Sequence, residues 1–456
     1  MLRLAPRVFF GACILTSTLA AGCGGDVQES TGSGTTTTTT DTGGGGAGGD
    51  TSTGGVGGMV VTGGMGGSGG STNGMPSDVY PAPHAAPPKV VSYGGPRLES
   101  PKIVPIFFAN DDANFDSKIE DFTNKVGATN YWTAIAAEYG VGPATGLPAI
   151  YSADTPTGTL DDTDIQAWLA SKLNADDPAF PAPDGNTLYA LYYPQGLSIT
   201  LDSGGGPPAQ SCTEFGGYHS DLSLDANHGN MLVPYAVMPH CSYPGETPLQ
   251  TMTATASHEY IEAATDPYPM SDPAYAIVDT AHIYWLFALG GGEVGDLCAQ
   301  SQSSFVTFPE LNYMVQRSWS NNSAKAGHDP CVPTLPGEVY FNAAPVLPDN
   351  VTLNIGQNIT VKGVKIALGE SKTIAVDLFS DAKTSGPWTV KAIDSSAIQG
   401  GPKQLDFAFD KDSGVNGEKL NLTITVLKTS PYKAEIFYLM STLNGTRNMW
   451  VGIVGN

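Results

Sequence analysis

The sequence SHEYIEAATDP occupies residues 257–267, near the middle of the 456-residue chain. It closes a longer stretch, compatible with a helix, that begins at Gln250. Proline lacks a backbone N–H and disfavours helical backbone in the residue before it, so Asp266-Pro267 should end that helix. We therefore expect a helix over residues 250–264.

One face of this helix carries side chains that bind metals. His258 and Glu262 are four residues apart, so they project from the same face and suit two ligands of one ion. Glu259 could reach a water bound to that ion and act as its general base. The pattern follows the zinc motif HExxH, with Glu in place of the second His. The alternative is an amphipathic helix whose polar face holds these residues without an ion.

A third ligand is expected from the glycine-rich segment GGGEVGDLC, residues 290–298. We expect Glu293 to complete the ligand set, with Asp296 supporting it or taking its place; two solvated acids are the alternative. Two carboxylates and one His would neutralise Zn²⁺, so its water would be less acidified than at a His-rich site. Zn²⁺ is the ion expected first, and Mn²⁺ or Ca²⁺ would also suit these ligands.

The region around this helix mixes strands and helices. Residues 102–108 (KIVPIFF) and 188–193 predict buried strands, and Pro105 suggests an edge or a bulge. Residues 116–139 predict one helix, and a second helix begins at the run Asp161–Asp164. These elements predict an α+β domain over residues 81–335.

After Pro336 short β-type runs replace the helical pattern. The sequence LNLTITV, residues 420–426, alternates apolar and polar side chains, as a strand with one buried face does. An antiparallel β-sandwich domain is therefore predicted over residues 336–456. Its expected strands are 351–355, 359–368, 372–379, 388–393, 405–409, 420–427, 434–440 and 448–454.

The N-terminus resembles that of bacterial lipoproteins. An apolar run from Val8 to Ala21 is too short for a permanent membrane-spanning helix. It ends in small residues directly before Cys23, which resembles a lipobox. We expect residues 1–22 to be a signal peptide and Cys23 to carry a lipid, which would anchor the protein to the membrane of the bacterial cell envelope, outside the cytoplasm. A plain secretory signal with an incidental Cys is the alternative.

Composition describes the segment that follows and excludes one class of partner. Residues 23–80 predict a disordered tether, since positions 24–76 hold 21 Gly, 12 Thr and no aromatic residue. The whole chain has 44 Asp and Glu against 21 Lys and Arg, a formal net charge of −23. Such a chain repels phosphate, so no nucleic-acid partner is expected.

Four cysteines remain after Cys13, in the signal peptide, and Cys23 are set aside. An even number in an exported chain predicts two disulfides, for which three pairings exist. Proximity in sequence favours Cys212–Cys241 and Cys298–Cys331. A metal site built from these cysteines is the alternative, although the chain has no CxxC spacing.

Three short strings resemble the exordium, or phosphate-induced, protein family and its bacterial relatives. They are His258-Glu259-x-x-Glu262-Ala263, Glu293-x-x-Asp296-x-Cys298 and Cys212-x-x-x-Gly216-Gly217-Tyr218-His219. The resemblance covers residues 95–332 and implies a zincin-like α+β domain in an exported, surface-associated protein. It also makes His219, which we expect in a loop, a candidate for a further ligand. The lipobox and the C-terminal sandwich lie outside the pattern of the plant members.

These features predict two functions. The first is metal-dependent hydrolysis of peptide bonds, with His258, Glu262 and Glu293 as ligands and Glu259 as general base. The second is non-catalytic binding at the cell surface, with a structural metal and a sandwich that binds a glycan or a protein. A metal-free architectural protein is a third reading. Metal content separates the third from the others, and activity on peptides separates the first two.

Overall fold

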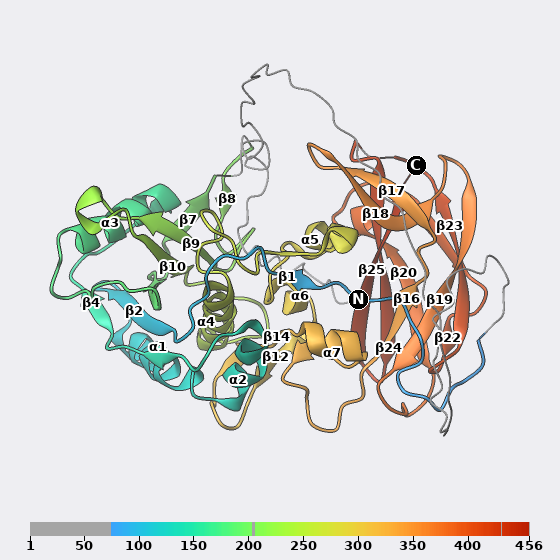
Figure 1. Ribbon diagram of the computed structural model, residues 1–456, viewed down its shortest axis with the longest axis horizontal. Coiled ribbons are helices and arrows are strands. Elements are labelled where there is room, and N and C mark those ends of the chain that lie inside the picture. The colour runs from blue at the N-terminus through green and yellow to red at the C-terminus, as the bar shows by residue number, and fades with distance from the viewer. Residues whose placement is uncertain (1–73, 203–205, 430, 456) are drawn as a thin grey trace, which may run out of the picture. The chain divides into compact units, whose positions relative to one another are not determined.

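The computed structural model describes residues 74–202, 206–429 and 431–455 (Figure 1). The predicted signal peptide, the lipidation site Cys23 and the tether up to residue 73 lie outside the described residues. The described chain mixes helices and strands as far as about residue 332 and is nearly all strand afterwards. The protein is therefore a mixed α/β protein rich in sheets. No helix in these ranges is both long and apolar enough to cross a membrane.

A mixed sheet organises the α/β part, with the strand order β3-β2-β6-β10-β9 and β4 also paired to β2. Strands β2, β6 and β10 are parallel, whereas β9 runs antiparallel to β10. The strands are β2 (Lys102–Phe108), β3 (Thr145–Gly146), β4 (Ile150–Ser152), β6 (Thr187–Tyr192), β9 (Tyr218–Ser223) and β10 (Leu232–Met238).

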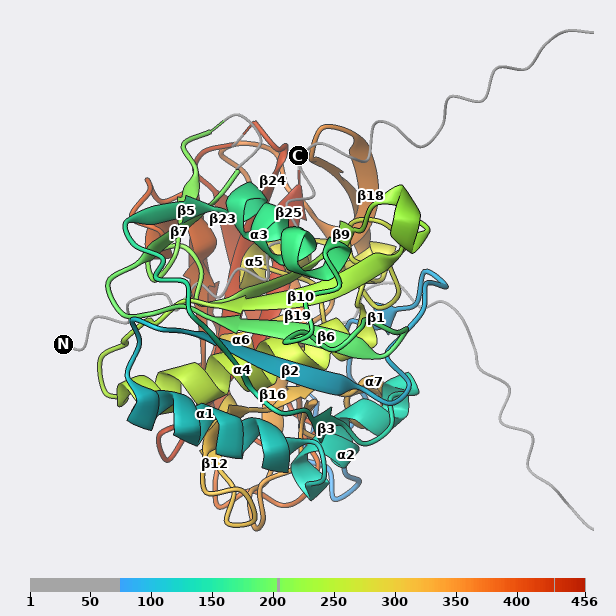
Figure 2. The same cartoon turned by 90° about the vertical axis from the view of Figure 1, so that its left-hand side faces the viewer.

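Helices cover both faces of this sheet. Figure 2 shows α3 on one side and α1 with α4 on the other. The helices of this part are α1 (Ala113–Val126), α2 (Asn130–Ala136), α3 (Asp162–Asn174), α4 (Pro248–Thr265), α5 (Tyr284–Leu289), α6 (Asp296–Ala299) and α7 (Asn321–Ala326). Short strands complete it: β1 (Val90–Val91), β5 (Thr159–Asp161), β7 (Ser198–Leu201), β8 (Ala209–Gln210), β11 (Ile277–Val278), β12 (Phe305–Thr307), β13 (Met314–Gln316), β14 (Ser318–Trp319) and β15 (Cys331–Val332).

Alternating residues of β2 serve the two faces. Ile103 and Phe107 belong to the core that contains the apolar residues of α1 and α4. Val104 and Ile106 belong to the core under α3. This period of two is what a strand buried on both faces requires.

Pro105 lies on a central strand and not on an edge strand, but β2 has no partner beside this residue on one side, so the expected edge exists only locally. β2 pairs with β3 at Lys102 and Ile103, and with β4 from Ile106 onward. Pro105 falls between these two pairings on that side, where no strand needs its missing N–H.

The helix expected over 250–264 forms as α4. Thr247 accepts a hydrogen bond from the backbone N–H of Gln250, whose side chain bonds back to Thr247, and Pro248 occupies the first turn. The single helix expected over 116–139 is wrong, because the chain breaks between α1 and α2 at Gly127–Thr129. A Cβ on Gly127 would lie 2.2 Å from the carbonyl oxygen of Ala144, and Thr129 caps the next helix.

The C-terminal part contains all eight expected strands in two larger sheets. One has the order β16-β19-β23-β21 and the other β17-β18-β25-β24-β20-β22. The strands are β16 (Phe341–Pro345), β17 (Asp349–Asn354), β18 (Asn358–Lys365), β19 (Ser371–Ser380), β20 (Trp388–Asp394), β21 (Leu405–Phe409), β22 (Ser413–Gly414), β23 (Lys419–Val426), β24 (Ala434–Leu443) and β25 (Thr446–Gly455), with the short helix α8 (Ser395–Ile398).

An antiparallel sandwich was expected, but these sheets are not wholly antiparallel. β18 and β25 pair in parallel at Val364 and Val454. The direction of β25 is set by its hairpin with β24, whose turn at Asn444-Gly445 has positive φ at both residues. The far edge of β25 then meets the end of β18, which runs the same way.

Residues 77–82 attach to the C-terminal part through Asn416, whose backbone carbonyl oxygen also accepts from the N–H of Ser77 at 2.8 Å. Asn416 donates to the carbonyl oxygens of Ser77 and Val79 and accepts from the backbone N–H of Ala82. Ordered contacts therefore begin within the last residues of the segment expected as tether.

Candidate metal centre

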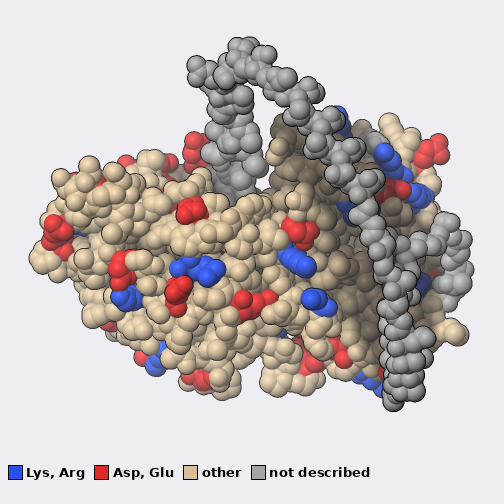
Figure 3. Space-filling model, viewed as in Figure 1, with Lys and Arg blue, Asp and Glu red and all other residues tan. Residues whose placement is uncertain are grey.

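Helix α4 is a central helix and not an amphipathic surface helix. Its residues from Thr251 to Thr265 are all buried, including His258, Glu259 and Glu262. Charged side chains are scattered over the face drawn in Figure 3, whereas these three lie inside. Burying ionisable groups is costly unless each finds a partner, so the surroundings of α4 decide what this face can do.

Four further ionisable side chains meet this face of α4. His219 comes from the edge strand β9, Asp266 from the end of α4, Glu293 from the loop after α5, and Asp296 from the start of α6. No member of the group is more than 5% exposed. We call this group the α4 cluster: His219, His258, Glu259, Glu262, Asp266, Glu293 and Asp296.

His258, Glu262 and Asp296 form one set of donors. The Nε2 atom of His258 lies 3.0 Å from Oε2 of Glu262 and 3.8 Å from Oδ1 of Asp296. Two atoms bound tetrahedrally to one Zn²⁺ at about 2.0–2.1 Å lie about 3.3 Å apart. These separations therefore bracket what a shared ion needs.

His219, Glu259 and Glu262 form a second set. The Nδ1 atom of His219 lies 3.4 Å from Oε2 of Glu259 and 3.8 Å from Oε2 of Glu262. Its Nε2 atom lies 3.6 Å from Oε2 of Glu293. The structure thus places Glu293, expected with His258, beside His219, and Asp296 takes the position next to His258.

The two oxygens of Glu262 have different surroundings. Oε1 accepts hydrogen bonds from the backbone N–H groups of Gly295, at 2.9 Å, and of Asp296, at 3.0 Å. Oε2 faces both histidines. The side chain of Gln316, on β13, donates to the carbonyl oxygen of Gly295 at 2.8 Å, so the glycine-rich loop is held by both α4 and β13.

Glycine is needed around the cluster for space. An added Cβ would lie 2.7 Å from Nδ1 of His258 at Gly295, and 2.9 Å from Oε1 of Glu259 at Gly217. At Gly291 it would lie 1.9 Å from Oδ2 of Asp296. Backbone and ionisable side chains therefore approach more closely than any other residue type would allow.

Burial and mutual charge shift the ionisation of these groups. Burial lowers the pKa of His258, but the carboxylates of Glu262 and Glu259 outweigh it and raise that pKa to about 10. Burial, followed by the charge of Glu262, raises the pKa of Asp296 to about 8. Burial also raises the pKa of Glu259. The cluster thus holds more negative charge than its surroundings readily accommodate, and protons or cations must compensate.

Several atoms in the cluster that can act as metal ligands are available to a cation. Among the described residues, Oε2 of Glu259, Oε2 of Glu262, Oδ1 of Asp296 and both ring nitrogens of His219 take part in no hydrogen bond. Imidazole nitrogens with carboxylate oxygens suit Zn²⁺ and Mn²⁺. The residues present therefore fit a divalent ion.

Two members of the cluster differ from the sequence-based expectation. His219 lies on β9, not in a loop, and stands opposite Ala236 on the face of the sheet that α4 covers. Asp266 was expected only to end the helix; it also accepts a hydrogen bond from the backbone N–H of Ala274 at 2.6 Å. In the sequence, the string Gly217-Tyr218-His219 indicated His219, and we find no sequence signal for Asp266.

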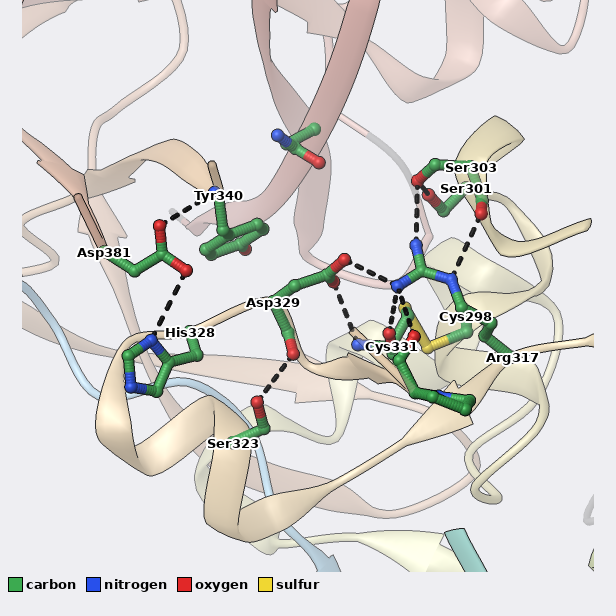
Figure 4. A network of polar contacts seen from close by, with 12 residues as sticks. Cys298, Ser301, Ser303, Arg317, Ser323, His328, Asp329, Cys331, Tyr340 and Asp381 are labelled. Carbon is green, nitrogen blue, oxygen red and sulfur yellow. Dashed lines mark hydrogen bonds and ion pairs between the residues drawn. A yellow bond between two sulfur atoms is a disulfide. The ribbon is translucent and has the colours of Figure 1, made fainter. Parts of the chain in front are cut away.

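Both expected disulfides are present, and one holds the segment next to the cluster. Cys212 pairs with Cys241, and Cys298 with Cys331. In Figure 4 the buried guanidinium of Arg317 lies beside the second bridge. It donates to the carboxylate of Asp329 at 2.7 Å, to both oxygens of Ser303 and to the carbonyl oxygen of Cys331. The chain after Asp296 is therefore fixed by covalent and polar contacts.

Comparisons with known proteins give little. No family model matches the chain, and no curated protein matches it. Among solved structures, domains 1–6 of the surface layer protein SbsC are 14% identical with a TM-score of 0.16, over 24% of this chain and 13% of that one. A FixG-related protein from Vibrio parahaemolyticus is 6% identical with a TM-score of 0.17, over 26% of this chain and 95% of that one. The titin M3 domain is 11% identical with a TM-score of 0.14, over 20% of this chain and 85% of that one. Likenesses this weak carry no argument about fold or function.

Proposed function

We propose that this chain is a cell-surface lipoprotein whose zincin-like α+β domain holds a divalent cation as a structural element. The observation that supports this is the burial of the α4 cluster, in which no side chain is more than 5% exposed. Structural zinc sites are closed, whereas catalytic sites keep a position open to substrate. In this reading the C-terminal sheets form a β-sandwich that binds a glycan or a protein at the cell surface.

His258, Glu262 and Asp296 would hold the ion, with Glu293 close by. The ion, Zn²⁺ in the first instance, would supply the positive charge that the cluster lacks. Glu262 orients the set, because its Oε1 is fixed by the backbone of Gly295 and Asp296. The ion would thereby tie α4 to the glycine-rich loop and add its binding free energy to the stability of the fold.

Elemental analysis tests this proposal. The chain from residue 23 onward, with Cys23→Ser to keep it in solution, is purified without chelator and measured for divalent metals. At least one equivalent is expected, and His258→Ala should lose it. Less than about a tenth of an equivalent of any divalent ion would refute the proposal.

The lipid anchor needs its own test. Cys23→Ser in cells should leave the protein unprocessed or release it from the membrane fraction. If the mass and the membrane fractionation of this variant match those of the native protein, the anchor is not at Cys23.

Metal-dependent hydrolysis of peptide bonds is the second candidate. The observation in its favour is that Glu259 adjoins the ligands and that burial raises its pKa, which suits a general base. The matched variant is Glu259→Gln, which keeps size and shape. Retained metal with lost peptide cleavage would support an enzyme, and a metal-loaded native protein inactive on varied peptides would support the binding protein.

A further inference from the structure

The donors of the α4 cluster fall into two groups that share one residue. His258 and Asp296 belong to one group, His219 and Glu259 to the other, and Glu262 to both. Within each group the ligand atoms all lie within 4.8 Å of one another. Every one of these side chains is at least nine-tenths buried.

A single ion does not span two such groups. Donor atoms bound to Zn²⁺ or Mn²⁺ lie about 2.0–2.2 Å from the metal, so two of them on opposite sides are at most about 4.4 Å apart. The five side chains form two sets, each with its ligand atoms within 4.8 Å of one another, rather than one larger set. Each set needs an ion of its own if all its donors are to bind.

The charge of the cluster also favours two ions over one. The cluster has five carboxyl groups and two imidazoles. With neutral imidazoles and ionised carboxylates, one divalent ion leaves three negative charges in the interior, and two ions leave one. Uncompensated buried charge is expensive, so the second ion removes most of the remaining cost.

Glu262 is placed to join the two ions. Its Oε1 is already engaged by two backbone N–H groups. Its Oε2 lies 3.0 Å from Nε2 of His258 and 3.8 Å from Nδ1 of His219. One carboxylate oxygen therefore faces a histidine of each group.

We propose that the α4 cluster is a two-cation centre bridged by Glu262. The first ion is that of the proposed function, on which this inference rests. The second is held by His219, Glu259 and Glu262, with Glu293 beside His219. Glu259 is then a ligand and not a general base, and the ions tie β9, α4 and α6 into one unit.

Metal stoichiometry tests the two-cation centre. The protein from residue 23 onward, with Cys23→Ser, is first freed of metal. It is then loaded with Mn²⁺ and separated from excess Mn²⁺ by gel filtration. We expect two equivalents in the parent, one in His219→Ala, and one in the isosteric Glu259→Gln. His228→Ala is the matched control, because that histidine pairs with Asp225 outside the cluster, and it should retain two.

Electron paramagnetic resonance of the parent protein gives a readout that needs no variant. Two Mn²⁺ ions joined by one carboxylate should give a spin-coupled spectrum, with the six-line signal of isolated Mn²⁺ lost at full loading and present in His219→Ala. One equivalent in the parent, an uncoupled spectrum and no change in His219→Ala would overturn the two-cation centre and leave the single-ion proposal standing. No bound metal in the parent would overturn both.

Discussion

The buried strand β23 and the buried helix α4 are stabilised in different ways. Along β23, alternate residues from Leu420 to Val426 are buried and all of them are apolar. Along α4 nearly every residue is buried, and one face is ionisable. The buried face of the strand gains stability from apolar area, while the buried face of the helix depends on what compensates His258, Glu259 and Glu262. The fold of one region should therefore respond to metal and the other should not.

Removing divalent metal should give the largest effect and should separate the two regions. A ligand at about 1,000 times its Kd stabilises by about 4 kcal/mol, and each kcal/mol moves the melting temperature of a domain of this size by about 2–4 °C. We expect a chelator to lower the transition that reports on α4 by about 10 °C. Hydrogen exchange followed by mass spectrometry should show lost protection in residues 248–265 and unchanged protection in residues 419–426. Equal loss in both segments would contradict the contrast.

Leu422→Ala should lower the stability of the C-terminal part by an amount that does not depend on metal. Leu422 is fully buried between its neighbours on β19 and β21, so truncation leaves a cavity and should cost about 3 kcal/mol. This cost, measured by denaturant unfolding, should be the same with and without chelator. Thr423→Ala is the control, since its side chain points to the other face of the strand, and it should cost much less. A cost for Leu422→Ala that depends on metal would show that the regions are energetically coupled.

Gly295→Ala should weaken the ion specifically. The added Cβ would meet Nδ1 of His258 at 2.7 Å and Oε1 of Glu262 at 2.8 Å. We expect metal affinity, measured by calorimetric titration of the apo protein, to fall about 10–100-fold, as for other changes that misplace a ligand. Gly185→Ala is the matched control, because its Cβ would meet nothing within 4 Å. Unchanged affinity in Gly295→Ala would place the ion away from the loop.

The same contrast explains how much of the structure the sequence could predict. The strands of the C-terminal part follow from local alternation, and the shared face of His258 and Glu262 follows from the helical period. Whether Glu293 or Asp296 meets His258 is not local. It depends on a loop whose glycines allow contacts closer than a side chain would, and on the hydrogen bonds that Gly295 and Asp296 donate to Glu262.

His219 shows the same limit from the side of the sheet. The local sequence does not say that residues 218–223 form an edge strand, because that depends on their pairing with β10 and on β10 joining the sheet beside β6. The pairing opposite Ala236 turns His219 toward α4, and a shift of one residue would turn it away. Register, which is a tertiary property, therefore decides whether this residue belongs to the cluster.

The smallest expected effect concerns Asp116, a buried acid of the α/β part that lies outside the α4 cluster. Burial, followed by the charges of Asp111 and Asp112, raises the pKa of Asp116 to about 7; Tyr151 also lies within its electrostatic range. A carboxyl whose folded pKa exceeds its unfolded value of about 4 lowers stability as pH rises between the two values, and the loss is complete above the folded pKa. Asp116→Asn should therefore raise the free energy of unfolding by about 1–2 kcal/mol at pH 8 and leave it nearly unchanged at pH 3.5.

The measurement for Asp116 is chemical denaturation of the parent and the variant from pH 3.5 to pH 8. The control is Asp78→Asn, an exposed acid for which the same change should alter little at either pH. A gain in Asp116→Asn that stays constant across this range would mean that the effect is one of packing. A gain that grows with pH but vanishes in chelator would mean that Asp116 acts through the metal, and the distinction between the two buried acidic regions of the α/β part would then be lost.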